Sequence, residues 1–321
     1  MSTLIFSSCT RKSSFYSGFL FILVIYLSGC KEPDTEIVET PVFLSDTTAD
    51  RVGYNTILTY QIYKDMLYPY QLYQPQQNPG FDAVIWNREK QNKETHQKIF
   101  RLFADIIPAE SRSEINHFSI IYQDNSFASM SAQKDNSLAN FRLATRPDLL
   151  SYLDSIPAFK APKFRHNTLG YSLAVYTMIH EFGHYLTLNN RQSYLSYLVD
   201  DDSYSPYPKK GSIIDSILTS YWKPYLTDDI VENCLPKNGN VYFCFPPESF
   251  VSAYASTSFN EDAAESFAHF VLLDDKPQRT NAANSKILLF YQHPEFIKLR
   301  LAIRQNLKKL GFSPKPANMT E

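Results

Sequence analysis

The segment from residue 168 to residue 188 constrains the fold most, because it reads as a long helix with apolar side chains on nearly every side. Its apolar residues are Leu169, Leu173, Val175, Met178, Ile179, Phe182, Leu186 and Leu188. A helix of this kind must be buried among other elements rather than lie on a surface. With 44% apolar residues in a chain of 321, there is enough material to build a core around it. We therefore expect a globular domain arranged around one central helix, which ends near Asn189.

The same helix carries titratable residues at a meaningful spacing, since residues 180–184 read His-Glu-Phe-Gly-His. Side chains four positions apart lie on one helical face, about 6 Å apart along the axis. His180 and His184 can therefore bind one zinc ion, and Glu181 can take a proton from water on that ion. Such residues are costly in an apolar helix unless they have partners or a metal. The alternative is a pair of core histidines around a salt-bridged glutamate, but the chain has only 7 histidines, so a chance match is rare.

A zinc site with two histidines is incomplete, and the next strong helix downstream opens with Asn-Glu-Asp-Ala-Ala-Glu at residues 260–265. This segment is similar to the third-ligand helix of gluzincin metallopeptidases, as in the thermolysin group and anthrax lethal factor. The resemblance implies that Glu261 is the third zinc ligand and that Glu265 hydrogen-bonds a ligand imidazole. It also implies that Tyr254, seven residues before Glu261, stabilises the tetrahedral intermediate. The alternatives are a helix-dipole role for Glu261 and ordinary packing for Tyr254.

The first 29 residues have the pattern of a lipoprotein signal peptide. A basic pair, Arg11 and Lys12, precedes an apolar run that is short for a membrane span, and residues 27–30 read Leu-Ser-Gly-Cys. This sequence resembles a bacterial lipobox, which implies that Cys30 is lipidated; the alternative is an uncleaved anchor. Residues 30–50 would form the lipidated start and a flexible tether, with a catalytic domain over 51–321. The acidic stretch after Cys30 resembles the surface-export signal of Bacteroidota lipoproteins, so we expect an outer-membrane lipoprotein at the cell surface, or otherwise on the periplasmic face.

Taken together, the lipobox, the His-Glu-Phe-Gly-His helix and the downstream helix resemble the substrate import-associated zinc metallohydrolase lipoproteins of Bacteroidota. The resemblance implies one Zn²⁺ per chain, a zincin-like α+β domain with a central active-site helix, a small mixed sheet and a helical C-terminal part. It also implies a peptide or glycopeptide substrate and a possible complex with a TonB-dependent transporter. The rival reading is a non-catalytic zinc-binding accessory lipoprotein of such an import complex. The insert at 190–250, longer than in thermolysin, is expected to wall one side of the substrate cleft.

The remaining patterns predict an α+β order of elements. Expected helices are 54–67, 91–106, 260–273, 283–291 and 294–309; expected extended stretches are 117–122 and 139–144; and 68–79 and 190–250 are expected to be irregular. Because zincins pair an extended substrate with an edge strand before the active helix, 139–144 is our candidate for that strand.

Cysteine usage and charge restrict the remaining possibilities. Cys9 leaves with the signal peptide and Cys30 carries lipid, so Cys234 and Cys244 are left around an Asn-Gly turn. We expect them to form a disulfide; two free buried thiols are the alternative. A net charge of −2 and a sequence pI near 6.4 exclude a basic nucleic-acid binder. A mean hydropathy of −0.30 excludes a multi-span membrane protein.

Overall fold

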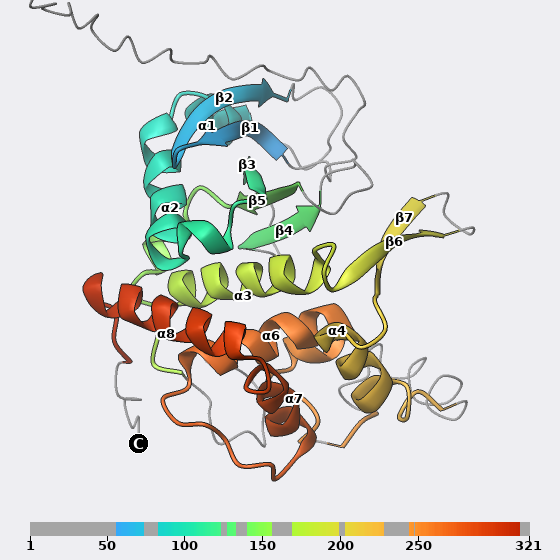
Figure 1. Cartoon of the computed structure of the whole chain (residues 1–321). Helices are drawn as coiled ribbons and strands as arrows, with labels where there is room; N and C mark the ends of the chain where they lie inside the picture. The colour runs from blue at the N-terminus through green and yellow to red at the C-terminus, as the bar shows by residue number, and fades with distance from the viewer. Residues whose placement is uncertain are drawn as a thin grey trace, which may run out of the picture. The chain divides into compact units, whose positions relative to one another are not determined.

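A five-stranded mixed sheet forms much of the N-terminal half of the described chain, and helices form most of the remainder (Figure 1). The computed structural model describes residues 56–73, 83–122, 127–132, 140–155, 169–198, 203–227, 244–246 and 248–314. The predicted signal peptide and tether lie outside these ranges, as do Cys30 and Cys234. The expectation of an α+β domain is confirmed, with the sheet followed by a helical C-terminal part.

The sheet has the strand order β2-β1-β3-β5-β4. Its strands are β1 (Thr56–Tyr63), β2 (Met66–Leu72), β3 (Ile115–Ile121), β4 (Ala128–Ala132) and β5 (Phe141–Thr145). Strands β3 and β5 are parallel, and the other neighbouring pairs are antiparallel. The sheet therefore has β2 at one edge and β4 at the other.

Two predictions for the first part of the chain are wrong. The expected helix at 54–67 is β1 and the start of β2, and the expected loop at 68–79 contains the rest of β2. The segment is rich in β-branched and aromatic residues, which favour a strand. The hairpin turn was hidden because it uses Lys64 and Asp65, with φ of 47° and 61°, rather than the Asn-Gly pair that usually marks such turns.

The long helix is α3 (Leu173–Leu188), and it lies between the sheet and the C-terminal helices (Figure 1). It begins after Ser172, whose side chain accepts a hydrogen bond from the Val175 N–H, so it starts later than predicted and ends as predicted before Asn189. Towards the sheet, Tyr185 packs edge-on against Phe141 of β5, with ring centroids 5.0 Å apart. Helix α2 (Lys93–Ile106), predicted at 91–106, follows α1 (Ala83–Glu89). It contacts the sheet through Phe100 and Phe118 and contacts α3 through Phe103 and Phe182.

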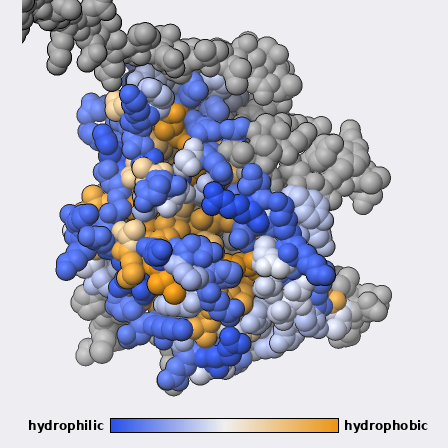
Figure 2. Space-filling view, in the orientation of Figure 1, coloured by the Kyte–Doolittle hydropathy of each residue, from blue (hydrophilic) through white to orange (hydrophobic). Residues whose placement is uncertain are grey.

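The C-terminal helices match their predicted positions to within one residue. They are α6 (Phe259–Leu272), α7 (Ala282–Phe290) and α8 (Pro294–Lys309). Arg300 and Arg304 of α8 donate hydrogen bonds to backbone carbonyls at the end of α6, which satisfies groups that a helix end leaves unpaired. Polar side chains cover most of the face seen in Figure 2, with apolar side chains showing around α8, where Leu301 is 59% exposed.

The insert at 190–250 has regular structure, which corrects the expectation that it is irregular. It contains an antiparallel ribbon of β6 (Ser193–Leu198) and β7 (Ser203–Pro208), the short helix α4 (Ile213–Ile217) and a π-helical turn at Leu218–Trp222. The Trp222 ring packs against Phe250, and its indole N–H donates to Asp262 of α6 over 2.8 Å. This part of the insert therefore belongs to the core around α6. No helix among the described residues has both the length and the apolar character needed to cross a bilayer.

Candidate metal centre

Helices α3 and α6 approach each other closely at Gly183, and this contact brings the two sequence motifs together. A Cβ atom at Gly183 would lie 2.9 Å from the Cα of Ala264, so a larger residue does not fit there without movement. Helix α6 begins after Ser258, whose hydroxyl accepts a hydrogen bond from the Glu261 N–H over 3.1 Å. The cap fixes Glu261 in the first turn of α6, directly opposite the histidines of α3.

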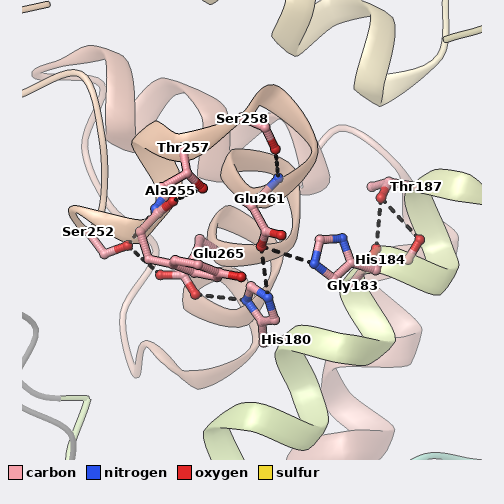
Figure 3. A network of polar contacts seen from close by, with 11 residues as sticks. His180, Gly183, His184, Thr187, Ser252, Ala255, Thr257, Ser258, Glu261 and Glu265 are labelled. Atoms are coloured by element: carbon pink, nitrogen blue, oxygen red, sulfur yellow. Dashed lines mark hydrogen bonds and ion pairs between the residues drawn. The ribbon is translucent and has the colours of Figure 1, made fainter. Parts of the chain in front are cut away.

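His180, His184 and Glu261 form a cluster in which the three candidate ligand atoms all lie within 4.8 Å of one another. Glu261 lies between the two imidazoles in Figure 3. Its Oε2 atom is 3.2 Å from His180 Nε2 and 3.1 Å from His184 Nε2. Two ligand atoms of a tetrahedral zinc ion, each about 2.0–2.1 Å from the metal, are about 3.3–3.4 Å apart. The two histidine–carboxylate separations are therefore close to those of a zinc site, and the N, N, O donor set suits that ion.

The Glu265 carboxylate influences which nitrogen of the His180 imidazole carries the proton. Its Oε1 atom lies 2.8 Å from His180 Nδ1, on the far side of the ring from Glu261. If Nδ1 carries the proton of a neutral imidazole and donates it to Glu265, then Nε2 presents a lone pair to Glu261. Two acceptors then face each other, and only a cation between them, or a second proton on the ring, relieves the repulsion. The arrangement is thus suited to a bound cation.

The same electrostatics perturbs the pKa values of the cluster. Burial alone would lower the pKa of His180, but hydrogen bonds to Glu261 and Glu265 outweigh it and raise this pKa well above the usual imidazole value. Burial alone would raise the pKa of Glu261, yet its hydrogen bonds with His180 and His184 hold it far below the usual carboxyl value. The Glu261 and Glu265 carboxylates therefore favour positive charge at His180, which the imidazole itself carries in the metal-free cluster.

Glu181 is buried beside the cluster and has one partner from the sheet. It accepts a hydrogen bond from the backbone N–H of Met130 in β4, while its Oε2 atom has no hydrogen-bond partner within the described part of the chain. Burial raises the pKa of Glu181, although the nearby His180 and His184 partly counter this effect. A carboxylate with a free oxygen and a raised pKa is a suitable proton acceptor.

Tyr254 also reaches the cluster, from a 3-10 turn at Tyr254–Thr257 just before α6. Its ring centroid lies 5.7 Å from that of His180, and its phenol hydrogen-bonds with Glu261. Burial, together with the nearby Glu261 and Glu181, raises the pKa of Tyr254. The phenol therefore stays protonated at neutral pH and can donate a hydrogen bond, while its side of the cluster remains accessible because Tyr254 is 52% exposed.

The strand beside the site is not the one predicted. Residues 141–145 form β5, which lies inside the sheet between β3 and β4, so the candidate at 139–144 is wrong as an edge strand. The edge strand next to α3 is β4, whose sequence Ala-Ser-Met-Ser-Ala lacks the β-branched and aromatic residues that mark strands. Sequence reasoning also missed Ser252, which donates a hydrogen bond to Glu265 over 2.5 Å. Cys244 is disulfide-bonded, and Cys234 lies outside the described residues.

Comparisons with known proteins add no assignment. No protein-family model matches this sequence, and no curated protein or solved structure matches it. The structure by itself establishes a buried His-His-Glu group that could hold one metal ion.

Proposed function

We propose that the chain is a zinc-dependent metallopeptidase of the gluzincin type, with a zincin-like fold, that hydrolyses peptide or glycopeptide bonds. The observation that carries the proposal is the pairing of a group of three candidate ligands with a buried glutamate, one of whose oxygens has no hydrogen-bond partner among the described residues. A structural zinc site usually has four protein ligands and no use for a general base, whereas a catalytic site keeps one position open. Within the described residues, the metal-binding group contains His180, His184 and Glu261 and no fourth ligand.

The two edges of the sheet differ in a way that supports substrate binding at β4. On the β2 edge, Pro69 removes one backbone donor and the Gln97 side chain accepts from the Leu67 N–H, so this edge is partly blocked. On β4, the Met130 N–H points to Glu181 rather than to β5, and no described strand pairs on that side. An extended peptide could add along β4 on the side away from β5 by backbone hydrogen bonds, next to Glu181.

The residues of the site fit the steps of amide hydrolysis. A zinc ion held by His180, His184 and Glu261 would lower the pKa of water to about 7 and polarise the substrate carbonyl. Glu181 accepts the proton of the attacking water and then gives it to the leaving amine. The Tyr254 phenol donates a hydrogen bond to the developing oxyanion. Glu265 holds His180 in the tautomer that leaves Nε2 free for the metal.

We further propose that the chain is an outer-membrane lipoprotein anchored through Cys30, exposed at the cell surface and serving nutrient import, in a possible complex with a TonB-dependent transporter. Support comes from the N-terminal sequence, in which a basic pair, an apolar run and Leu-Ser-Gly-Cys stand in order. Labelling with a radioactive fatty acid, compared between the native chain and Cys30→Ala, tests the anchor. Incorporation that persists in Cys30→Ala would refute it.

The activity is tested with residues 31–321, purified and measured for bound zinc and for cleavage of a peptide and glycopeptide library. Cleavage should be lost in Glu181→Gln while zinc remains bound, because the glutamine side chain cannot accept the proton of the attacking water. Bound zinc without cleavage of any peptide or glycopeptide by the native protein would favour the accessory-lipoprotein alternative. Unchanged zinc affinity in Glu261→Ala would refute the third-ligand assignment.

A further inference from the structure

Ser252 lies where two parts of the proposed site meet, although nothing in its local sequence marks it. Its hydroxyl donates to Glu265 Oε2 over 2.5 Å and accepts from the Ala255 N–H over 2.9 Å (Figure 3). The first contact reaches the second turn of α6, and the second reaches the turn that carries Tyr254. Ser252 is 2% exposed, so neither contact competes with bulk water.

The Glu265 carboxylate is shared between Ser252 and the metal cluster. Its Oε1 atom lies 2.8 Å from His180 Nδ1, and its Oε2 atom accepts a hydrogen bond from the Ser252 hydroxyl. Tyr176 also hydrogen-bonds with this carboxylate. Because Oε2 is hydrogen-bonded to Ser252 while Oε1 makes the ion-pair contact with His180, the carboxylate cannot rotate away from His180 without losing the buried Ser252 hydrogen bond. The orientation of the imidazole therefore depends on a hydroxyl that does not touch it.

The backbone around Ser252 is itself fixed by the core. The preceding residues, Phe250 and Val251, are 1% and 2% exposed. The Phe250 ring packs against Trp222, with centroids 5.6 Å apart. The core thus fixes the backbone of Ser252, and the Ser252 hydroxyl holds both Glu265 and the Tyr254 turn in place relative to that backbone.

We propose that Ser252 is a positioning residue of the metal centre: its hydroxyl joins the Glu265 carboxylate to the Tyr254 turn and so fixes His180 and Tyr254 relative to each other. The kinetic part of this inference rests on the proposed peptidase function, whereas the zinc-binding part does not. Partners that orient a metal-bound histidine typically change metal affinity by 10–100-fold when they are removed.

The test compares Ser252→Ala with Ser256→Ala in the full chain. Ser256 is a matched control because it lies four residues away in the Tyr254–Thr257 turn, is 1% exposed, and donates to the Ala253 carbonyl rather than to Glu265. Zinc affinity is measured by competition with a chromophoric chelator, and the visible spectrum of the cobalt-substituted protein reports the ligand geometry. We expect Ser252→Ala to lose about 10–100-fold in zinc affinity with an altered cobalt spectrum, and Ser256→Ala to match the native protein in both.

A second comparison separates positioning from general destabilisation. In a Glu265→Gln background, Ser252→Ala should cause little further loss of zinc affinity, because both residues act through the same carboxylate. At saturating zinc, Ser252→Ala should lower kcat more than it changes KM, because Tyr254 acts on the transition state. Native zinc affinity and an unchanged cobalt spectrum in Ser252→Ala, or losses that add fully with Glu265→Gln, would overturn the proposal. If the native chain binds zinc but cleaves nothing, the peptidase proposal fails while the affinity test still decides the role of Ser252.

Discussion

The contact between α3 and α6 at Gly183 makes the metal site sensitive to a single methyl group. In Gly183→Ala, the new Cβ would lie 2.9 Å from Ala264 Cα, 3.1 Å from Ala264 O and 3.3 Å from Phe267 Cδ1. Non-bonded carbon atoms pack at about 3.5 Å or more, so the helices must separate by about 0.6 Å, which is 3.5 Å less 2.9 Å. The nearest atoms belong to the backbone of α6, and rotation of a side chain cannot relieve this clash.

The displacement matters because the candidate metal ligands come from both helices. Ligand distances in a zinc site tolerate deviations of about 0.2 Å, and a shift of about 0.6 Å in α6 moves Glu261 away from His180 and His184 by a comparable amount. We expect a loss of about 10–100-fold in zinc affinity, which is about 1.4–2.7 kcal/mol. Stability without metal should change less, since Ala gains about 1 kcal/mol of helix propensity against an overpacking cost of about 1–3 kcal/mol.

Two measurements on Gly183→Ala distinguish these effects. Zinc affinity is obtained by chelator competition, and the free energy of unfolding is obtained from urea titration in EDTA, with His184→Ala as the reference for a site that has lost a ligand. Gly183→Ser should bind zinc more weakly than Gly183→Ala because its side chain is larger. Native zinc affinity in Gly183→Ala would refute the reasoning, and so would a loss of affinity explained entirely by unfolding of the metal-free protein.

Two further predictions concern buried charges away from the ligand atoms. Lys286 and Asp262 form an ion pair in which both side chains are fully buried. Lys286→Met should therefore lower the free energy of unfolding by about 3–5 kcal/mol, and adding Asp262→Asn should recover part of that loss. Urea titration in EDTA measures both, and a double variant no more stable than Lys286→Met would contradict the prediction. His96 is buried beside Glu89 and Tyr60, and burial lowers its pKa despite its hydrogen bond to Glu89. Because the unfolded chain then binds a proton more readily, the stability present above pH 6.5 should be lost as the pH falls below 6.5, at up to about 1.4 kcal/mol per pH unit. In urea titrations at pH 7.5, 6.5 and 5.5, the free energy of unfolding of His96→Gln should depend less steeply on pH than that of the native chain. Equal slopes would contradict this prediction.

The sequence was informative where function depends on local spacing. His180 and His184 are four residues apart on one helix, so their convergence follows from helical geometry alone. Glu261 and Glu265 repeat that spacing on a second helix. The resemblance of residues 260–265 to the third-ligand helix of gluzincins predicted that the two helices share one site. The central helix was predictable for a similar reason, because a segment without a polar face can only be buried. The spacing within each motif and the burial of the central helix need only residues that are near one another along the chain, whereas the pairing of the two helices rested on the resemblance.

The sequence was misleading where the outcome depends on pairing between distant segments. Whether a strand lies at the edge of a sheet depends on which other strands pair with it. Strand β4 pairs with β5 and takes the edge position, but its mostly small residues do not predict a strand. Ser252 was missed for the same physical reason, because its importance comes from a contact with Glu265, 13 positions away, and not from its own type. The candidate metal ligands could thus be predicted from two short motifs, whereas the groups that orient them and the strand that would align a substrate emerge only from the assembled core. Substitutions at Gly183 and Ser252 are accordingly the sharper tests of the fold's contribution, since neither residue supplies a ligand atom.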